Sequence, residues 1–497
     1  MTVLSKINYQ IIVHLLGLLF LVNGLFMLLT TGVSLYYADN QFAMLLLSGI
    51  VAMGIGGLLM IVTRNYRKEI KSREGYIIVT SGWISMALIG CLPYLFTGTI
   101  PRFTDAFFES MSGFTATGAT ILNDVEIMPR SILFWRSLTH WIGGMGIIVL
   151  AVAIFPLLGI GGMQLFKAEM TGPDNDKLHP RITDTAKRLW GIYVGFTLIQ
   201  ALLLKVSGMG LFDAVNHAMS TMSTGGFSTK NNSLAYWNDN PMIHYIVIVF
   251  MLIGSCNLIL SYLAIKGRFR KIFRNEELKT YLWILAIFTI LVSIIILFNT
   301  QFTLNDLTFD VVETSFRHSL FQVISIISTT GLLTADFTLW TPFLTLLFFG
   351  MMFLGGCAGS TSGGIKLMRH LIMIKNGILE FKRTLHPNAI LPVRYNGKAV
   401  PQAIVFNILG FFIMYMLSFI AGSLVFSWIG LDFQSAIGGA AATLGNVGPA
   451  LGSLGPSNTY ALLPDVAKWW SSFLMLLGRL ELFTVLILIT PFFWRNR

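Results

Sequence analysis

The 497-residue chain is 55% hydrophobic and only 11% charged, with a mean hydropathy of +0.72. Soluble domains carry about 25% charged residues, so this composition excludes a soluble globular protein and indicates a polytopic membrane protein. The net charge of +11 comes from short basic links between apolar segments. Because no folded basic domain is predicted, the charge does not indicate a nucleic-acid partner.

The N-terminal part of the chain predicts two membrane-spanning helices at residues 11–36 and 42–63. Each is long enough to cross a hydrocarbon core of about 30 Å at 1.5 Å per residue. A strongly basic link, residues 64–73, follows them.

The rest of the chain predicts four further pairs of spans, each pair enclosing a polar loop segment. The pairs and their loops are 76–97 and 131–157 around 104–130, 189–208 and 241–264 around 212–240, 280–299 and 341–374 around 308–338, and 401–430 and 466–494 around 432–464. This organisation gives ten spans and four re-entrant segments. We divide the chain into the two N-terminal helices (1–73) and four pore units, 74–175, 176–275, 276–398 and 399–497.

A short Gly/Ser/Thr stretch occurs once in each loop, around Gly118, Gly225, Gly331 and Gly445. The near-equal spacing indicates an internal repeat. Non-helical backbone survives at membrane depth only inside protein or along a water-filled path, and glycine adopts backbone angles closed to other residues. Such stretches also pack ordinary membrane helices. Four equivalent copies instead favour a ring of carbonyl oxygens that replaces the hydration shell of a monovalent cation.

Charge is distributed by side. Of the 34 Lys and Arg residues, 26 lie in the N-terminus, the alternate links and the C-terminal tail, so the positive-inside rule places both termini in the cytoplasm and the glycine loops outside. Thirteen of the 23 acidic residues lie on the outer side. We therefore expect a negative outer mouth that concentrates cations.

With these glycine stretches, the sequence resembles the Trk/Ktr/HKT superfamily of potassium transporters over essentially its whole length. The two extra N-terminal helices make it resemble the bacterial TrkH/TrkG branch more than KtrB. The resemblance implies an all-α polytopic protein of the bacterial cytoplasmic (inner) membrane, with four helix–pore loop–helix units around a central pore. It implies that K⁺ is the transported ion, with no organic cofactor and no enzymatic activity.

The resemblance also implies a set of potassium-filter residues. These are Ala116, Thr117, Gly118, Ser223, Thr224, Gly225, Thr329, Thr330, Gly331, Thr443, Leu444 and Gly445. In this alignment Leu444 departs from the threonine of the other three copies, so the fourfold symmetry of the filter is expected to be imperfect. Asp105, Asp213 and Asp432 precede their glycines by 13, 12 and 13 residues, and we expect them to cap the pore helices.

Two further features lie inside predicted spans of units three and four. The segment from Phe353 to Lys366 holds five glycines, each disfavouring a helix by about 1 kcal/mol relative to alanine. It is not a phosphate loop, because Ile365 separates Gly364 from Lys366. Arg479 places a charge at a depth where charges usually face a cavity or a partner; pairing with Glu481 or with loop carbonyls is the structural alternative. The resemblance implies an intramembrane gate formed by Gly355, Gly356, Gly359, Ser360, Thr361, Ser362, Gly363, Gly364 and Arg479.

The resemblance implies three partners: the lipid bilayer, a second copy of the chain in a homodimer, and a cytoplasmic nucleotide-binding RCK-type (TrkA-like) subunit docked at link 158–188. Two other function classes stay open. A secondary transporter coupled to protons or sodium and built on broken helices would need buried carboxylates at the membrane centre, where only Glu481 qualifies. A membrane-embedded enzyme would need clustered Asp, His, Ser or Cys at one depth, and the sequence shows no such cluster.

Overall fold

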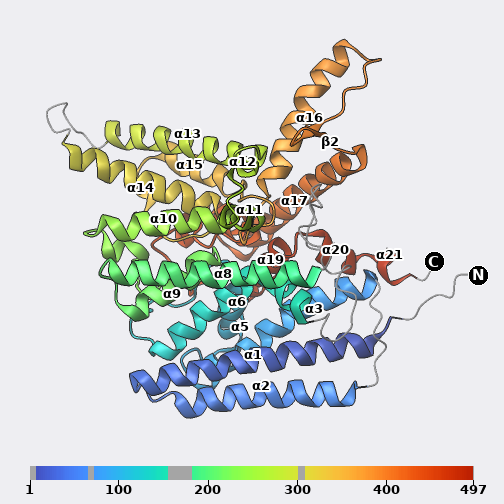
Figure 1. Cartoon of the computed structure of the whole chain (residues 1–497). Helices are drawn as coiled ribbons and strands as arrows, with labels where there is room; N and C mark the ends of the chain where they lie inside the picture. Colours follow the sequence, from blue (N-terminus) through green and yellow to red (C-terminus); the bar gives the residue numbers. More distant parts are fainter. Residues whose placement is uncertain (1–6, 65–71, 155–181, 300–307, 496–497) are drawn as a thin grey trace, which may run out of the picture.

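The computed structural model describes residues 7–64, 72–154, 182–299 and 308–495 (Figure 1). The regular secondary structure of this part of the chain is helical except for one hairpin. Its two short strands, β1 (Arg394–Tyr395) and β2 (Lys398–Ala399), pair antiparallel. The turn residues Asn396 and Gly397 both have positive φ, which is the geometry of a tight type I′ hairpin.

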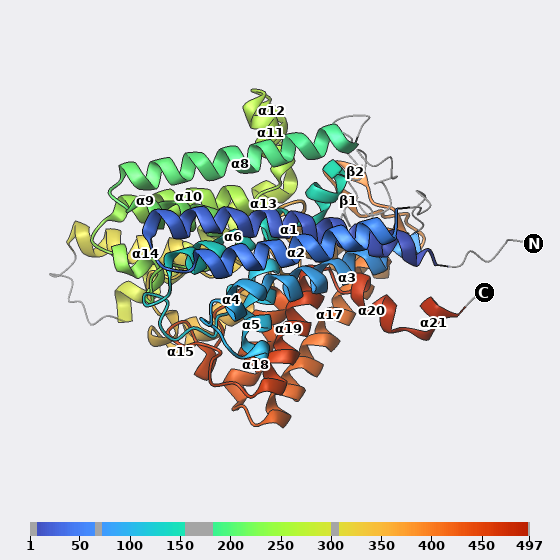
Figure 2. The same cartoon turned by 90° about the horizontal axis from the view of Figure 1, so that it is seen from below.

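Helices α1 (Tyr9–Tyr37) and α2 (Phe42–Val62) form an antiparallel pair along one side of the molecule (Figures 1 and 2). Glycines allow their close approach: a Cβ at Gly17 would lie 2.8 Å from the Gly56 carbonyl oxygen, and one at Gly24 would lie 2.9 Å from that of Gly49. Small residues at such contacts are typical of membrane helix pairs. The two predicted N-terminal helices are thus present, outside the repeated units.

Each of the four following units has a first helix, a short pore helix and a second helix. In chain order these are α3 (Ser72–Gly90), α5 (Phe103–Phe114) and α6 (Arg130–Ile154); α8 (Ile182–Val206), α9 (Leu211–Met222) and α10 (Pro241–Ser255); α13 (Glu276–Asn299), α14 (Phe309–Ile327) and α15 (Pro342–Met351); and α17 (Gln402–Ile429), α18 (Phe433–Gly445) and α19 (Asp465–Arg479). The other helices are α4 (Leu92–Phe96), η1 (Ser233–Trp237), α11 (Leu258–Ile265), α12 (Phe269–Ile272), η3 (Phe337–Leu339), α16 (Leu367–Leu385), η4 (Gly452–Leu454), α20 (Phe483–Ile489) and α21 (Pro491–Trp494). The predicted unit boundary at 175/176 lies outside the described residues.

The second helix of every unit is interrupted. Gly146 breaks α6 with φ 65°, α10 and α11 meet at 108°, α19 and α20 meet at 120°, and residues 352–366 separate α15 from α16. The predicted spans at 131–157, 241–264 and 466–494 are therefore bent or broken in the part of them that the structure describes. The local causes differ: Asn257 caps the restart of α11, whereas Glu481 and Leu482 adopt positive φ before α20.

The second helices pack closely on the ends of the pore helices. A Cβ at Gly143 would lie 2.0 Å from the carbonyl oxygen of Phe114, and one at Gly478 would lie 2.0 Å from that of Leu444. Because no larger residue fits at these distances, the glycines set how near the helices come. The pore helices are consequently enclosed, and most of their residues are buried.

By length and composition, six of the described helices could each cross a membrane, and eight spans result if each bent pair counts as one. Of the ten predicted spans, the other two correspond to α6 and to the interrupted α15–α16 segment. Helix α16 projects from the body of the molecule beside the start of α17 (Figure 1).

Candidate functional site

The four pore helices end in the same turn. Two residues before each turn ends, the chain adopts a left-handed conformation, and a positive-φ glycine closes the turn. The left-handed residues are Ala116 (φ 51°), Thr224 (53°), Thr329 (57°) and Asn446 (54°), and the glycines are Gly118 (84°), Gly226 (90°), Gly331 (73°) and Gly448 (94°). In each turn, the residue between the left-handed residue and the glycine donates its N–H to the carbonyl oxygen five residues earlier. The bonds are Thr117 to Ser112 (3.0 Å), Gly225 to Ser220 (2.9 Å), Thr330 to Ser325 (2.8 Å) and Val447 to Ala442 (2.9 Å). These shared bonds and φ signs make the four turns structurally equivalent.

The turns contact one another in a closed ring. A Cβ at Gly118 would lie 2.2 Å from the Gly225 carbonyl oxygen, and one at Gly226 would lie 2.2 Å from that of Thr330. The contacts continue from Gly331 to Val447 (2.2 Å) and from Gly448 to Thr117 (2.5 Å). Each glycine therefore packs against the carbonyl that precedes the glycine of the next unit. Any side chain at these four positions would force the ring apart.

The predicted alignment of the repeats is wrong by one residue in unit two and by three in unit four. Gly226 and Gly448, not Gly225 and Gly445, are equivalent to Gly118 and Gly331. Gly445 is instead the last residue of α18. The equivalent of Thr117 in unit four is Val447, and Leu444 corresponds to the apolar ends of the other pore helices, so it is not a departure within the turn.

The three acidic residues before the turns do not all occupy equivalent positions. Asp432 is the N-cap of α18 and accepts from Ser435 N–H, and these bonds lower the pKa of its carboxyl. Asp105 and Asp213 lie inside the first turns of α5 and α9, so the capping prediction holds only for Asp432. Counting from Asp432 therefore starts three positions too early. A constant spacing of 13 residues from Asp105 and Asp213 would have identified Gly226 in unit two.

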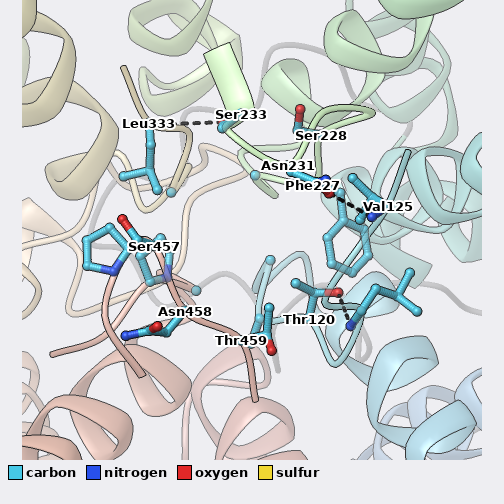
Figure 3. Close-up of a pocket in the computed structure, with 18 of the residues that line it drawn as sticks. Thr120, Val125, Phe227, Ser228, Asn231, Ser233, Leu333, Ser457, Asn458 and Thr459 are labelled. Carbon is cyan, nitrogen blue, oxygen red and sulfur yellow. Dashed lines mark hydrogen bonds between the residues drawn. The ribbon is translucent and has the colours of Figure 1, made fainter. Parts of the chain in front are cut away.

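A cavity of about 200 Å³ lies on one side of the ring, where the chain continues beyond the glycine of each turn (Figure 3). All four units contribute to its lining, including Gly118, Gly226, Gly331 and Gly448. Figure 3 shows segments of units one, two, three and four around it, with Thr120, Phe227, Leu333 and Thr459 among them. The ring thus forms the floor of a vestibule built by the whole repeat.

The vestibule does not have the expected acidic lining. Its described lining residues include Arg136 and Lys230 but no carboxylate. The nearby acids pair with bases instead: Glu109 with Arg136 (2.8 Å), Glu126 with Lys230 (3.4 Å). Asp124 accepts from the Asn231 side chain, which lowers the pKa of its carboxyl. Two bases and otherwise uncharged residues therefore line the cavity, and the acids that pair with these bases are not among its lining residues.

The segment 352–366, which we call the loop, lies on the opposite side of the ring from the vestibule. It contacts the left-handed residues of two turns: Gly363 N–H donates to Thr329 Oγ1 (2.7 Å), and Thr361 Oγ1 lies 3.4 Å from Thr224 Oγ1. A positive φ is unusual for the β-branched threonine, and these contacts help to hold the strained residues. A Cβ at Gly363 would also lie 2.5 Å from the Gly445 carbonyl oxygen, so the loop packs directly against the ends of the pore helices.

The loop is fixed to neighbouring units by several hydrogen bonds. Thr361 Oγ1 donates to the carbonyl oxygens of Met222 (3.1 Å) and Gly254 (3.0 Å) in unit two. Gly355, Gly359 and Gly364 have positive φ, which lets the segment fold back on itself without helical hydrogen bonds. The predicted interruption of the unit-three span is therefore confirmed.

Arg479 joins the loop to units one and four. It is the last residue of α19, and its guanidinium donates to the carbonyl oxygens of Thr361 (2.7 Å), Gly143 (2.5 Å) and Gly144 (2.9 Å). The alternative of pairing with loop carbonyls is thus the observed arrangement. Glu481 pairs with Arg369 at 2.5 Å.

Glu277, which the sequence did not single out, and Lys366 also hold the loop. The Glu277 carboxylate, in the first turn of α13, accepts from Ala358 N–H (2.7 Å) and Met368 N–H (3.2 Å), at the middle and the end of the loop region. Its other oxygen accepts from Tyr395 O–H in the hairpin (3.2 Å). Lys366 Nζ donates to Ser360 and Ser362. One of two adjacent acids at the start of an apolar helix carries no such signal in sequence.

Comparison with known proteins agrees with this architecture. The family described as "TrkH: Cation transport protein" matches residues 43–495. The chain is 41% identical to the Trk system potassium uptake protein TrkH of Salmonella typhimurium over 98% of its own length and 100% of that protein. It is 35% identical to TrkG of Escherichia coli over 98% and 99%.

A solved structure shares the fold. The crystal structure of the potassium transporter TrkH from Vibrio parahaemolyticus superposes with a TM-score of 0.87 at 38% identity, covering 98% of this chain and 100% of that one. The predicted all-α membrane architecture is confirmed by this match. The chain belongs to the TrkH family of cation transport proteins.

Proposed function

We propose that this protein carries potassium into a bacterial cell through a pore whose selectivity filter is the ring of four turns. The observation that most directly supports this proposal is the closed ring of contacts between each positive-φ glycine and a carbonyl of the next unit. Carbonyl oxygens held in such a ring replace the water around a dehydrated potassium ion. The names of the relatives, which are potassium uptake proteins, support the choice of ion.

The proposed filter differs in part from the one predicted from sequence. The backbone carbonyls that form it belong to the left-handed residue and the one after it in each turn: Ala116 and Thr117, Thr224 and Gly225, Thr329 and Thr330, Asn446 and Val447. Gly118, Gly226, Gly331 and Gly448 close the turns. Ser223, Thr443, Leu444 and Gly445 belong to the ends of pore helices behind the ring.

The loop and Arg479 form the proposed gate. The loop packs against the inner ends of the turns, so an ion that leaves the filter meets it next. Arg479 adds a fixed positive charge to the same place, and a like charge beside a cation path raises the barrier to passage. Opening then requires the bonds from Thr361 and Arg479 to break.

We further propose that both termini face the cytoplasm and that the chain works as a homodimer with a cytoplasmic RCK-type regulatory subunit. The relatives belong to a named Trk system, which is consistent with more than one component. On α16, Ile374, Ile378, Phe381 and Leu385 are exposed at helical spacing, and this unpaired apolar stripe fits a second copy. The predicted docking link 158–188 falls largely outside the described residues.

Flux into liposomes that contain only the purified chain tests the proposal. We expect passive uptake that favours potassium and rubidium over sodium and lithium. Uptake that requires a proton or sodium gradient would replace the pore with a coupled transporter. If no uptake occurs, the same assay with the Arg479→Ala variant distinguishes a closed gate from a missing pore.

A further inference from the structure

One buried ion pair lies behind the vestibule and contacts the filter segments of two units. We propose that Glu109 and Arg136, together with the Phe227 ring that Arg136 covers, position the outer ends of the first and second turns and so set the discrimination between potassium and sodium. These are positioning residues, because none of them belongs to the carbonyl ring. The inference rests on the proposed function and deepens it.

Glu109 holds the chain that leaves the first turn. It lies in α5, nine residues before Gly118, and its side chain is fully buried. The carboxylate accepts from Thr120 Oγ1 (2.9 Å) and Ile121 N–H (3.0 Å), two and three residues after Gly118. All of these bonds therefore act on the segment directly beyond the filter glycine.

Arg136 extends this contact across the unit boundary. From α6, its Nε donates to Glu109 (2.8 Å), and a terminal nitrogen donates to Thr120 Oγ1 (3.2 Å). The other terminal nitrogen donates to the Ser228 carbonyl in unit two (3.4 Å). One buried guanidinium thus bonds to the segments that follow both Gly118 and Gly226.

Phe227, the residue directly after Gly226, is clamped from both faces. The Arg136 guanidinium carbon lies 4.0 Å from its ring centroid, and the His140 ring stacks at 3.9 Å with an interplanar angle of 10°. Two groups this close to one centroid must occupy opposite faces of the ring. Arg136 and His140 are one helical turn apart on α6. Helix α6 of unit one therefore contacts the filter turn of unit two directly.

The other units place different groups at the position of Glu109. Nine residues before its glycine, unit two has His217, whose Nε2 lies 3.0 Å from Ser228 Oγ, and unit three has Gln322, which donates to the Ala335 carbonyl (3.0 Å). Unit four has Gly439 there. The same fold therefore forms without an ion pair at this position in three units. A purely architectural need would apply to all four, so the pair has a local role at the first and second turns.

Removal of one partner leaves a buried charge without its counter-charge, and the two turns are then expected to shift. A carbonyl ring that relaxes loses its preference for the larger ion, because discrimination depends on how firmly the oxygens are held. Potassium still passes in this state, but sodium passes with it. The predicted effect is therefore on selectivity rather than on transport itself.

The test compares sodium and potassium uptake into liposomes for wild type, Arg136→Lys, Glu109→Gln and Phe227→Leu. We expect the potassium-to-sodium ratio to fall by about tenfold in Arg136→Lys, the change that about 1.4 kcal/mol produces, because lysine cannot reach Glu109, Thr120 and Ser228 together. Phe227→Leu retains the ion pair and removes the clamped ring, so it should lower the ratio as well.

The matched control is Lys468→Met. Lys468 pairs with Asp105 at 2.6 Å and is 2% exposed. This pair joins α19 to α5, and among the described residues the Lys468 ammonium does not bond to the segments after the glycines. It should lower thermal stability and leave the ratio unchanged. A wild-type ratio in folded Arg136→Lys and Phe227→Leu overturns the inference, and so does loss of folding in both. A wild-type protein that fails to discriminate would instead overturn the proposed function.

Discussion

At the residue scale, the absence of a side chain decides where each turn can lie. Gly225 belongs to the proposed filter through its carbonyl, which packs against Gly118, and the His140 ring fills the space beside its Cα. A Cβ at Gly225 would lie 2.3 Å from His140 Nδ1. At Gly331, a Cβ would meet the Val447 carbonyl at 2.2 Å with φ at 73°.

We expect Gly225→Ser and Gly331→Ser to lower the potassium-to-sodium uptake ratio, with the larger effect at Gly331, where strain adds about 1–2 kcal/mol for a non-glycine residue. The ratio is measured in liposomes by competition between the two ions. Gly57→Ser is the control, because a Cβ at Gly57 meets no atom within 4 Å. Retained selectivity in both variants would remove these glycines from the filter.

The alignment of unit four has its own test. Gly448→Ala places a Cβ 2.5 Å from the Thr117 carbonyl oxygen at φ 94°, whereas a Cβ at Gly445 has its nearest neighbour, the Met352 carbonyl oxygen, at 3.1 Å. Gly448→Ala should therefore reduce selectivity strongly, and Gly445→Ala should change it little. The reverse order would support the alignment predicted from sequence spacing.

At the element scale, the loop is held by side chains of its own unit and of units two and four. Arg479 of unit four bonds to it, and its other partners are carbonyls of unit one. Glu277 bonds the loop to the start of α13 and to the hairpin through Tyr395. The loop is therefore an element whose position depends on contacts that can be removed singly.

Arg479→Ala should raise potassium flux by about tenfold, as expected when about 1.4 kcal/mol is taken from a barrier, because it removes a fixed charge and a bond to Thr361. Initial rates of rubidium uptake measure the change. Arg383→Ala, on the exposed part of α16, serves as the control. A lower or equal rate for Arg479→Ala would give this arginine a structural role.

Glu277→Gln should also raise flux while selectivity stays at the wild-type value, because it loosens the loop without touching the ring. An amide has one acceptor oxygen where the carboxylate has two, so it cannot serve Ala358, Met368 and Tyr395 equally well. Glu276→Gln is the matched neighbour, since Glu276 pairs with Lys375 outside the loop. Changed selectivity in Glu277→Gln would mean that the loop is part of the filter.

At the scale of the whole molecule, four sequentially similar units produce a ring that is not chemically symmetric. The residues at the position of Glu109 differ in each unit, and the residue before the glycine is threonine in units one and three but glycine in unit two and valine in unit four. The projecting α16 belongs only to unit three, and its apolar stripe has no cover within the described chain. Unit three thus alone has both the loop that we propose as part of the gate and the surface that we propose for a partner.

Replacement of Phe381 and Ile378 by aspartate should convert a dimer to a monomer, because charges at both positions oppose burial of the stripe. Light scattering of the detergent-solubilised protein measures the mass. Asn376→Asp adds a charge to the opposite face of α16 and should leave the dimer intact. An unchanged mass for the double variant would place the dimer interface elsewhere.

The amino-acid sequence alone determined the class of the protein, the number of repeated units and the region of each turn, because apolar spans and Gly/Ser/Thr stretches are local patterns that need no neighbour to be recognised. It also indicated the interruption at 353–366, where five glycines oppose a helix. The breaks in the other second helices could not be predicted, since the glycines around Gly146 and the single Asn257 are each compatible with a continuous span.

Tertiary structure decided which residue of each stretch lies in the ring. Asp432 is a helix cap and Asp105 is not, so equal spacing along the chain did not mean equal position in space, and only the hydrogen bonds of the turns identified Gly226 and Gly448. It also decided the partners of Glu109, Arg136 and Glu277, whose contacts lie in segments that follow a turn or belong to another unit. Contacts of this kind arise from packing and leave no periodic pattern in the sequence.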